Sequence, residues 1–163
     1  MSITSRKSLS AGFSLIELMV TLVILGVLVT IAQPLAKMTV QRSKEQELRT
    51  ALRQIRTALD SYKQAVDEGR ISKNIGDSGY PKSLELLVVG VDDIKDPRHG
   101  KIYFLRQLPR DPMFADNSVS PQTTWGKRSY ASSREEPREG DDVFDVYSLS
   151  KEVGINGIKY REW

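Results

Sequence analysis

The sequence predicts an α+β protein in which one long N-terminal helix spans a membrane and its exported half packs on a small antiparallel β-sheet. An apolar run extends from Phe13 to Ala32, and apolar residues at helical spacing continue over residues 48–66. Short segments of strand character follow residue 100. Three parts are therefore expected: a leader at 1–12, a transmembrane and assembly helix at 13–33, and a head at 34–163 that includes the second half of the helix.

The apolar run is long enough to cross a membrane once. The run contains about 20 residues, which as a helix would be ~30 Å long. This length matches the hydrocarbon thickness of a bilayer. Arg6 and Lys7 precede the run, so the positive-inside tendency places the N-terminus in the cytoplasm. The polar side chains within it are Ser14, Glu17, Thr21 and Thr30.

Glu17 is the anomaly in this run, because an ionised carboxylate inside hydrocarbon costs ~2.5–3.5 kcal/mol. It therefore needs a partner. Cleavage after Gly12 would place a positive α-amine on Phe13, one helical turn from Glu17, and would free helix-terminal N–H groups that attract an anion. The amine can belong to the same chain or to a neighbouring one. The alternative places Glu17 near the headgroups, where it stays hydrated.

An ordinary secretory signal is the competing interpretation of the N-terminus. Thr30-Ile31-Ala32 weakly resembles a small-x-small cleavage site. The apolar run is too long for this interpretation, since the apolar region of a signal peptide has ~7–15 residues and no buried acid. A mature protein that starts at Gln33 would support the signal peptide.

The second half of the helix carries one apolar face, formed by Leu48, Leu52, Ile55, Leu59, Tyr62 and Val66. This spacing predicts a helix whose apolar face is covered by the rest of the chain. A two-stranded coiled coil is the alternative use of the face. Charged residues lie between and are expected to face solvent or a partner: Lys44, Glu45, Arg49, Arg53, Arg56 and Lys63. Glu45 and Arg49 are one turn apart and can pair.

Gly26 and Pro34 are the predicted weak points of the long helix. Pro34 has no amide hydrogen and clashes with the preceding turn, so it predicts a kink. Gly26 lowers helix stability in the same region. The helix is expected to end near Gly69, which is a suitable C-cap.

The remainder predicts one short helix and several strands. Residues 82–88 predict the helix, with Ser83 as a possible cap and Gly90 as its end. Residues 91–100 predict a surface connection, because acids and bases mix there with proline and glycine. Strand character occurs at residues 101–105, 125–130 and 143–149, most clearly in the last.

Composition argues against catalysis and against nucleic-acid binding. The chain has 24 basic and 21 acidic residues, mostly interspersed, and lacks the aromatic interleaving of a nucleic-acid surface. Cysteine is absent, which excludes disulfides and thiolate metal sites. His99 is the only histidine, so no serine–histidine–acid arrangement has support. The sequence predicts no enzyme.

The N-terminal pattern resembles the type IV pilin and pseudopilin family. The matching features are the short basic leader, Gly12-Phe13, Glu17 four residues on, and a long apolar helix with Pro34 beyond its core. The resemblance implies that a prepilin peptidase cuts between Gly12 and Phe13 and methylates the new Phe13 amine. It also implies that Glu17 neutralises the Phe13 amine of an adjacent subunit during assembly, and that the helix between Gly26 and Pro34 stretches or melts in the fibre.

The second half of the chain resembles the major pseudopilin of type II secretion systems. The motifs that carry this are Tyr80-Pro81, Leu108-Pro109-Arg110-Asp111-Pro112, Trp125-Gly126 with Tyr130, Asp145-Val146-Tyr147-Ser148-Leu149 and Trp163, in that order. The resemblance implies a pilin-like periplasmic head on a subunit held in the bacterial inner membrane, which then joins a homo-oligomeric filament, the pseudopilus. Its partners would be membrane lipid, minor pseudopilins and an inner-membrane assembly platform. The alternatives are a type IV pilus subunit, major or minor, for adhesion, motility or DNA uptake, and a membrane-tethered binding or enzymatic domain.

The sequence departs from the major pseudopilins in the loop after the last strand. In that family the loop binds calcium through carboxylates and backbone carbonyls. Calcium takes 6–8 oxygen ligands, and residues 150–158 offer only Glu152 and Asn156, beside Lys151. Asp141, Asp142 and Asp145 are explained equally well by a charged turn that leads into a strand. We therefore expect no calcium ion, no other metal and no cofactor.

Overall fold

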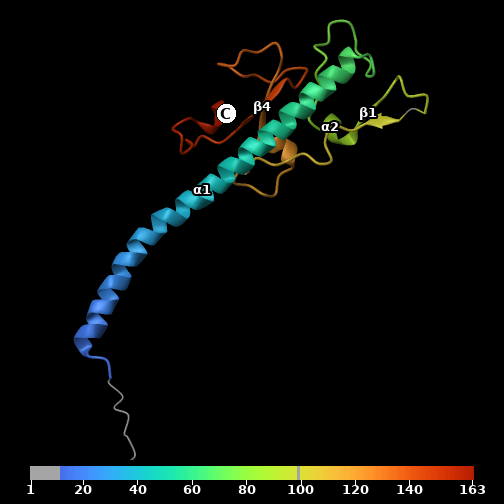
Figure 1. The fold of residues 1–163 in the computed structure, drawn as a ribbon. Coiled ribbons are helices and arrows are strands. Elements are labelled where there is room, and N and C mark those ends of the chain that lie inside the picture. The colour runs from blue at the N-terminus through green and yellow to red at the C-terminus, as the bar shows by residue number, and fades with distance from the viewer. Residues whose placement is uncertain (1–11, 99) are drawn as a thin grey trace, which may run out of the picture. The chain divides into compact units, whose positions relative to one another are not determined.

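The computed structural model describes residues 12–98 and 100–163, with the side chains of residues 31–36 left out. Its contacts divide the chain into two compact units, one ending at Val40 and the other, here called the head, formed by Gln41–Trp163. The fold is α+β, as predicted (Figure 1). Its elements are α1 (Leu15–Asp67), α2 (Leu86–Val89), β1 (Val91–Asp92), β2 (Lys101–Ile102), a 3-10 turn (Pro121–Thr124), β3 (Trp125–Arg128), β4 (Asp145–Ser148) and a last 3-10 turn (Tyr160–Glu162).

The prediction of one long helix is confirmed, and α1 ends where Gly69 allows it to end. Gly69 has φ +69°, a left-handed conformation that glycine adopts without a Cβ penalty. Its N–H donates to Val66 O at 2.9 Å, and the N–H of Arg70 donates to Ala65 O at 2.9 Å. These two bonds form a Schellman motif, which satisfies carbonyl groups at the end of the helix.

Several predictions fall outside what the structure describes. The leader before Gly12 and His99 lie outside the described residues. Pro34 lies among the residues whose side chains are left out, so its kink stays a prediction. Gly26 is an exposed residue within α1, and its predicted role also stays untested.

The predicted apolar face of α1 is the centre of the core. Its six members range from 0% exposed at Leu48 and Ile55 to 8% at Tyr62. They pack in one cluster with residues from every other part of the head, among them Leu84, Leu87, Trp125, Val143, Val146 and Tyr160. Figure 1 shows β4 and the C-terminal segment lying against this half of α1. The apolar face of α1 is therefore covered by the rest of the same chain. This is the first of the two uses predicted for the face, the other being a two-stranded coiled coil.

The single predicted sheet is replaced by two small antiparallel sheets, one of β1 and β2 and the other of β3 and β4. In the second, Trp125 pairs with Ser148 and Arg128 pairs with Asp145. β1 falls in residues 91–100, which were predicted to be a surface connection. β2 stops at Ile102 because the N–H groups of Phe104 and Leu105 both donate to Leu87 O, at 3.0 and 2.9 Å, and leave the strand.

The short helix α2 forms four residues later than predicted. Ser83 does not cap it; Glu85 occupies the N-cap position without a side-chain hydrogen bond. Leu84 and Leu87 are buried, which agrees with the prediction that the leucines point inward. Gly90 ends the helix, and its N–H donates to Leu86 O at 3.1 Å.

A buried aspartate joins the loop before β3 to the end of β4. The carboxylate of Asp111, 2% exposed, accepts hydrogen bonds from the Ser148 hydroxyl at 2.6 Å and from the Met113 N–H at 2.8 Å. Nearby, the indole N–H of Trp125 donates to Pro109 O at 2.8 Å. Burial raises the pKa of Asp111 above its ordinary value, although both hydrogen bonds favour the ionised form.

The raised pKa predicts a pH-dependent effect of Asp111→Asn. A carboxyl with a raised folded pKa contributes stability that is present below its unfolded pKa of ~3.9 and is lost as pH rises through the folded value. Asparagine does not ionise, so the variant lacks this pH-dependent loss of stability. Its side-chain oxygen still accepts the Met113 N–H. The free energy of unfolding of the variant, relative to wild type, should therefore increase from pH 4 to pH 7. Urea denaturation of the full chain in detergent, followed by tryptophan fluorescence, measures it.

Asp116→Asn is the control of opposite sign. The Ser118 hydroxyl lowers the pKa of the exposed Asp116, so its stabilising contribution is present above the unfolded pKa and is lost as pH falls. The Asp116 variant should lose stability relative to wild type as pH rises. Two variants that respond to pH in the same direction would contradict the assignment.

Candidate functional site

The predicted processing site lies immediately before α1. Gly12, Phe13 and Ser14 are outside the helix and exposed, and Phe13 has 76% of its surface accessible. Exposed segments without secondary structure are where proteases act most readily. The peptide bond between Gly12 and Phe13 is therefore open to a peptidase in this structure.

Ser14 caps the helix, a role that the sequence analysis missed. Its hydroxyl oxygen accepts the N–H of Glu17 at 3.2 Å, and its carbonyl accepts the N–H of Leu18 at 3.1 Å. Ser14 and Glu17 have the spacing of a capping box, Ser-x-x-Glu, which is the sequence signal that predicts such a cap. The cap places Glu17 in the first turn, where an acidic side chain interacts favourably with the free N–H groups.

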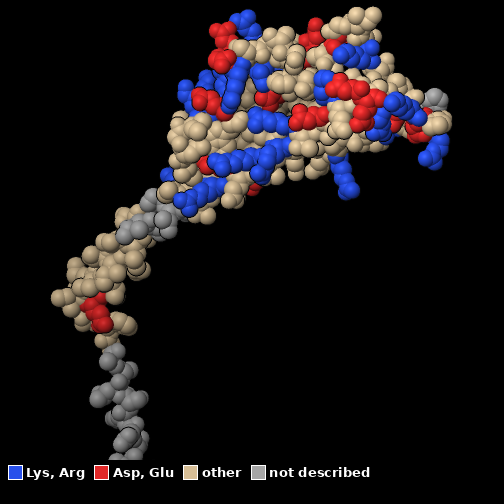
Figure 2. Space-filling model, turned by 45° about the horizontal axis from the view of Figure 1, so that its top comes forward, with Lys and Arg blue, Asp and Glu red and all other residues tan. Residues whose placement is uncertain are grey.

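The first unit exposes apolar side chains on every side of α1. Among the large apolar side chains from Phe13 to Val29, exposed fractions run from 79% at Leu15 to 51% at Val20. Figure 2 shows this segment in tan, interrupted by acidic atoms in red near its start. The hydroxyls of Thr21 and Thr30 donate to carbonyls three residues earlier, at 2.9 and 2.7 Å, so these polar groups are satisfied within the helix. A helix that is apolar all round is one that other apolar groups bury.

No helix in the described part of the chain has both the length and the hydropathy that a membrane span needs. The predicted span, 13–32, ends within the residues whose side chains are left out.

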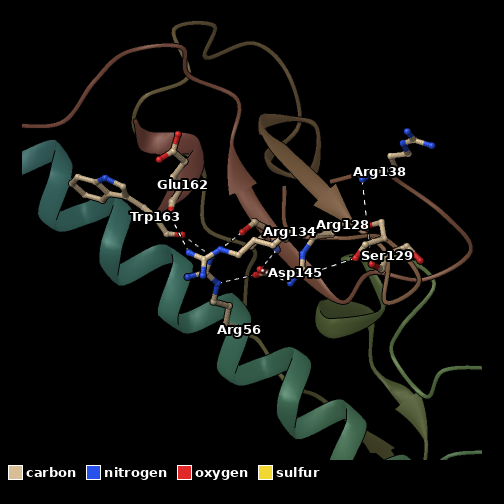
Figure 3. A network of polar contacts seen from close by, with 10 residues as sticks. Arg56, Arg128, Ser129, Arg134, Arg138, Asp145, Glu162 and Trp163 are labelled. Atoms are coloured by element: carbon tan, nitrogen blue, oxygen red, sulfur yellow. Dashed lines mark hydrogen bonds and ion pairs between the residues drawn. The ribbon is translucent and has the colours of Figure 1, made fainter. Parts of the chain in front are cut away.

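Arg56 joins α1 to the sheet and to the C-terminus, which corrects the expectation that it faces solvent or a partner (Figure 3). Its guanidinium donates to the Asp145 carboxylate at 2.8 Å, to Val146 O at 3.2 Å and to the main-chain oxygen of Trp163 at 2.8 Å. Arg128 reaches the other oxygen of Asp145 at 3.3 Å. The network joins three segments of the chain: α1, the sheet of β3 and β4, and the C-terminal residue.

Glu45 holds the C-terminal loop, residues 149–159, on α1. One of its carboxylate oxygens accepts the N–H of Ile155 at 2.7 Å and the hydroxyl of Tyr160 at 2.9 Å. Gln41 donates to the same hydroxyl at 3.0 Å. Burial raises the pKa of Tyr160; the hydrogen bond from Gln41 opposes this rise, and the hydrogen bond that Tyr160 donates to Glu45 adds to it.

The prediction that Glu45 faces outward and pairs with Arg49 is wrong. Glu45 is 7% exposed and is engaged by the C-terminal loop, a contact between residues 110 positions apart that local spacing does not reveal. Arg49 instead lies over the Trp163 ring, 4.4 Å from its centroid. Lys63 pairs with Asp67 one turn on, although it too was expected to face solvent or a partner.

Two of the three acids considered for a metal site, Asp142 and Asp145, are engaged with protein groups. Asp142 accepts hydrogen bonds from the Ser78 and Ser129 hydroxyls, and Asp145 pairs with two arginines. Among the residues that the structure describes, no three acidic or histidine side chains are placed to hold a metal ion. In the loop that binds calcium in pseudopilins, the N–H of Ile155 donates to the Glu45 carboxylate.

Comparison with known proteins gives one match. Residues 7–33 match a family model described as the prokaryotic N-terminal methylation motif. The matched residues include Gly12, Phe13 and Glu17, whose individual roles the match does not test. No curated protein and no solved structure matches the chain.

The Ser14 cap predicts a local effect of Ser14→Ala. Loss of an N-cap costs about 0.5–2 kcal/mol, so hydrogen exchange at the Glu17 amide should accelerate by roughly 2- to 30-fold. Exchange measured on the full chain in detergent micelles tests this. Thr21→Ala is the matched control, because it removes a hydroxyl from the same helix without touching the cap. Equal acceleration of the Glu17 amide in both variants would show that Ser14 is not the cap.

Proposed function

From the type IV pilin and pseudopilin signature that the chain carries at residues 7–33, we propose that it is a structural subunit of a type II secretion pseudopilus. The observation that carries this proposal is the position of the signature. It coincides with an exposed non-helical segment, a capped helix start and an apolar helix that contains a single acid in its first turn. In this proposal, the positive terminus and the single acid attract each other during assembly and take no part in catalysis.

Maturation begins with removal of residues 1–12 by a prepilin peptidase, which then methylates the Phe13 amine. The exposure of Gly12 and Phe13, which lie outside the helix, supports cleavage at this bond, since exposed segments without secondary structure are cut most readily. After cleavage, Phe13 becomes a positive terminus next to the Ser14 cap. Cleavage leaves the Ser14 cap in the mature chain, so α1 keeps its first turn.

The helix then serves twice, first as anchor and next as the packing element of the fibre. Residues 13–32 hold the subunit in the bacterial inner membrane, with the N-terminus cytoplasmic and the head periplasmic. In the filament, apolar side chains now exposed on the single chain are buried against neighbouring copies, at ~25 cal/mol for each Å² removed from water. The other components of the proposed secretion system are minor pseudopilins and an inner-membrane assembly platform.

The ion pair between Glu17 and the Phe13 amine of a neighbouring subunit sets the axial position of the packed helices relative to one another. In the described residues, no ion pair involves Glu17. Two unit charges 4 Å apart attract by ~1 kcal/mol in water and by ~4 kcal/mol at an effective dielectric constant of 20. The pairing therefore gains strength as apolar helices exclude water around it.

The head contributes a rigid body and a surface. The core beneath α1, the Arg56 network and the Glu45 anchor tie it together. The N-terminal signature is shared with pili, so a type IV pilus subunit remains the alternative within the family. The order of motifs in the head favours the secretion system.

Glu17→Ala separates a filament subunit from a simple membrane tether. The variant should be made, should lose residues 1–12 normally, and should yield at least ~10-fold fewer filaments, because an unpaired terminal amine in an apolar bundle costs several kcal/mol. Mass spectrometry reports processing, and quantitative electron microscopy of sheared fibres reports assembly. Glu47→Ala removes an exposed acid from the head and serves as the control. Normal fibres from the Glu17 variant would contradict the proposal.

We also propose that the head folds without calcium. Three of the loop oxygens already accept hydrogen bonds: Gly154 O from Gly157 N–H at 2.9 Å, Ile158 O from Gly154 N–H at 2.9 Å, and the Asn156 side chain from Ile158 N–H at 3.1 Å. Calorimetry of the full chain in detergent should give no saturable heat with calcium, and EDTA should leave Tm unchanged. Saturable binding at micromolar calcium would contradict this.

A further inference from the structure

We propose that the C-terminal loop and the adjoining turns of α1 form a contact surface for an anionic phospholipid bilayer. This inference rests on the proposed function, because it requires the chain to be anchored by residues 13–32. It concerns a different part of the molecule, the head, and a different interaction, with lipid headgroups. Three observations carry it: exposed aliphatic side chains, an excess of basic residues around them, and the short length of helix that separates them from the anchor.

Four aliphatic side chains project from the C-terminal loop into solvent. Their exposed fractions are 44% for Leu149, 48% for Val153, 42% for Ile155 and 46% for Ile158. All four belong to residues 149–158, and exposed apolar side chains that gather on one surface mark interaction sites.

The backbone that presents these side chains is held in place. Gly154 is buried, and a Cβ there would lie 2.6 Å from the Trp163 ring, so no other residue fits. The indole N–H of Trp163 donates to Ile158 O at 3.3 Å, and the N–H of Tyr160 donates to Glu152 O at 3.2 Å. The aliphatic groups are therefore preorganised for a partner.

Basic residues surround the aliphatic group. The exposed basic residues of 41–49 and of the C-terminal loop are Arg42, Lys44, Arg49, Lys151 and Lys159. The exposed acids of the same two segments are Glu47 and Glu152, while Glu45 is buried and engaged. Figure 2 shows basic side chains in a row along the lower edge of the head. A basic surface with aliphatic side chains is the combination that binds the interface of an anionic membrane.

The proposed anchor keeps this surface close to a bilayer. Gln41 donates to Val153 O at 3.5 Å, so the C-terminal loop lies beside the start of the head. Gln41 follows Ala32 by nine helical residues, which is about 14 Å of rise. The headgroup layer itself extends ~5–7 Å beyond the hydrocarbon. This limit on the distance holds for any angle between the two units.

Lipid explains the surface better than a second copy of the chain. A second copy presents the same basic residues, and like charges repel across a low-dielectric contact. Each Lys or Arg near an anionic bilayer contributes instead to attraction. The head would thus rest on the membrane before the subunit enters the fibre.

A fluorescent label at position 155 tests the contact. Because the chain has no cysteine, Ile155→Cys can be labelled uniquely with an environment-sensitive dye. The labelled full chain is incorporated at one copy per nanodisc, into neutral phosphatidylcholine or into a mixture with phosphatidylglycerol. The expected result is a blue shift, a several-fold rise in emission and quenching by lipid-borne quenchers in the anionic discs. Ile75→Cys, fully exposed and beyond the other end of α1, should show none of these changes.

Charge reversal then identifies the source of the attraction. The double variant Lys151→Glu and Lys159→Glu, carrying the same label, should lose most of the response to phosphatidylglycerol. Lys73→Glu with Lys101→Glu changes charge equally at exposed positions elsewhere and should keep the response. A label indifferent to lipid charge, or one that responds only with two copies per disc, would overturn the inference. Failure of the unmodified chain to enter neutral discs would contradict the anchor, and with it the proposed function.

Discussion

Burial of one face of α1 is the interaction on which the rest of the head depends. Leu48 and Ile55 have no exposed surface, and the covering residues come from α2, both members of the second sheet and the last turn. The strands of the head are short, and two-stranded sheets are marginal on their own. The helix therefore acts as the common support that brings these segments together.

Polar groups decide how the covering segments are oriented on that support. Arg56 binds Asp145 and the main-chain oxygen of Trp163, while Glu45 binds Ile155 and Tyr160. Both side chains come from α1, and both hold parts of the chain about 90 to 115 positions away. A buried or half-buried charge is costly without its partners, so these contacts specify one arrangement of the C-terminal segment.

The same helix performs opposite tasks in its two halves. After Gln41 its apolar face is buried within the chain, whereas the large apolar side chains from Leu15 to Val29 are exposed. The exposed half is available to other apolar surroundings, and the capped first turn presents Glu17 where a positive terminus can reach it. Anchoring and packing through one element, with a separately folded head, is the division that a filament subunit requires.

The sequence by itself determined the long helix, its apolar face, its end at Gly69 and the N-terminal signature, because helical periodicity, capping chemistry and motif spacing are local. It also contained the Ser14 and Glu17 spacing, although the cap was recognised only in the structure. Tertiary structure alone decided the roles of Glu45, Arg56 and Asp111, since their partners lie far away along the chain. It also divided the strands into two sheets, because competing contacts such as those to Leu87 O end each strand early.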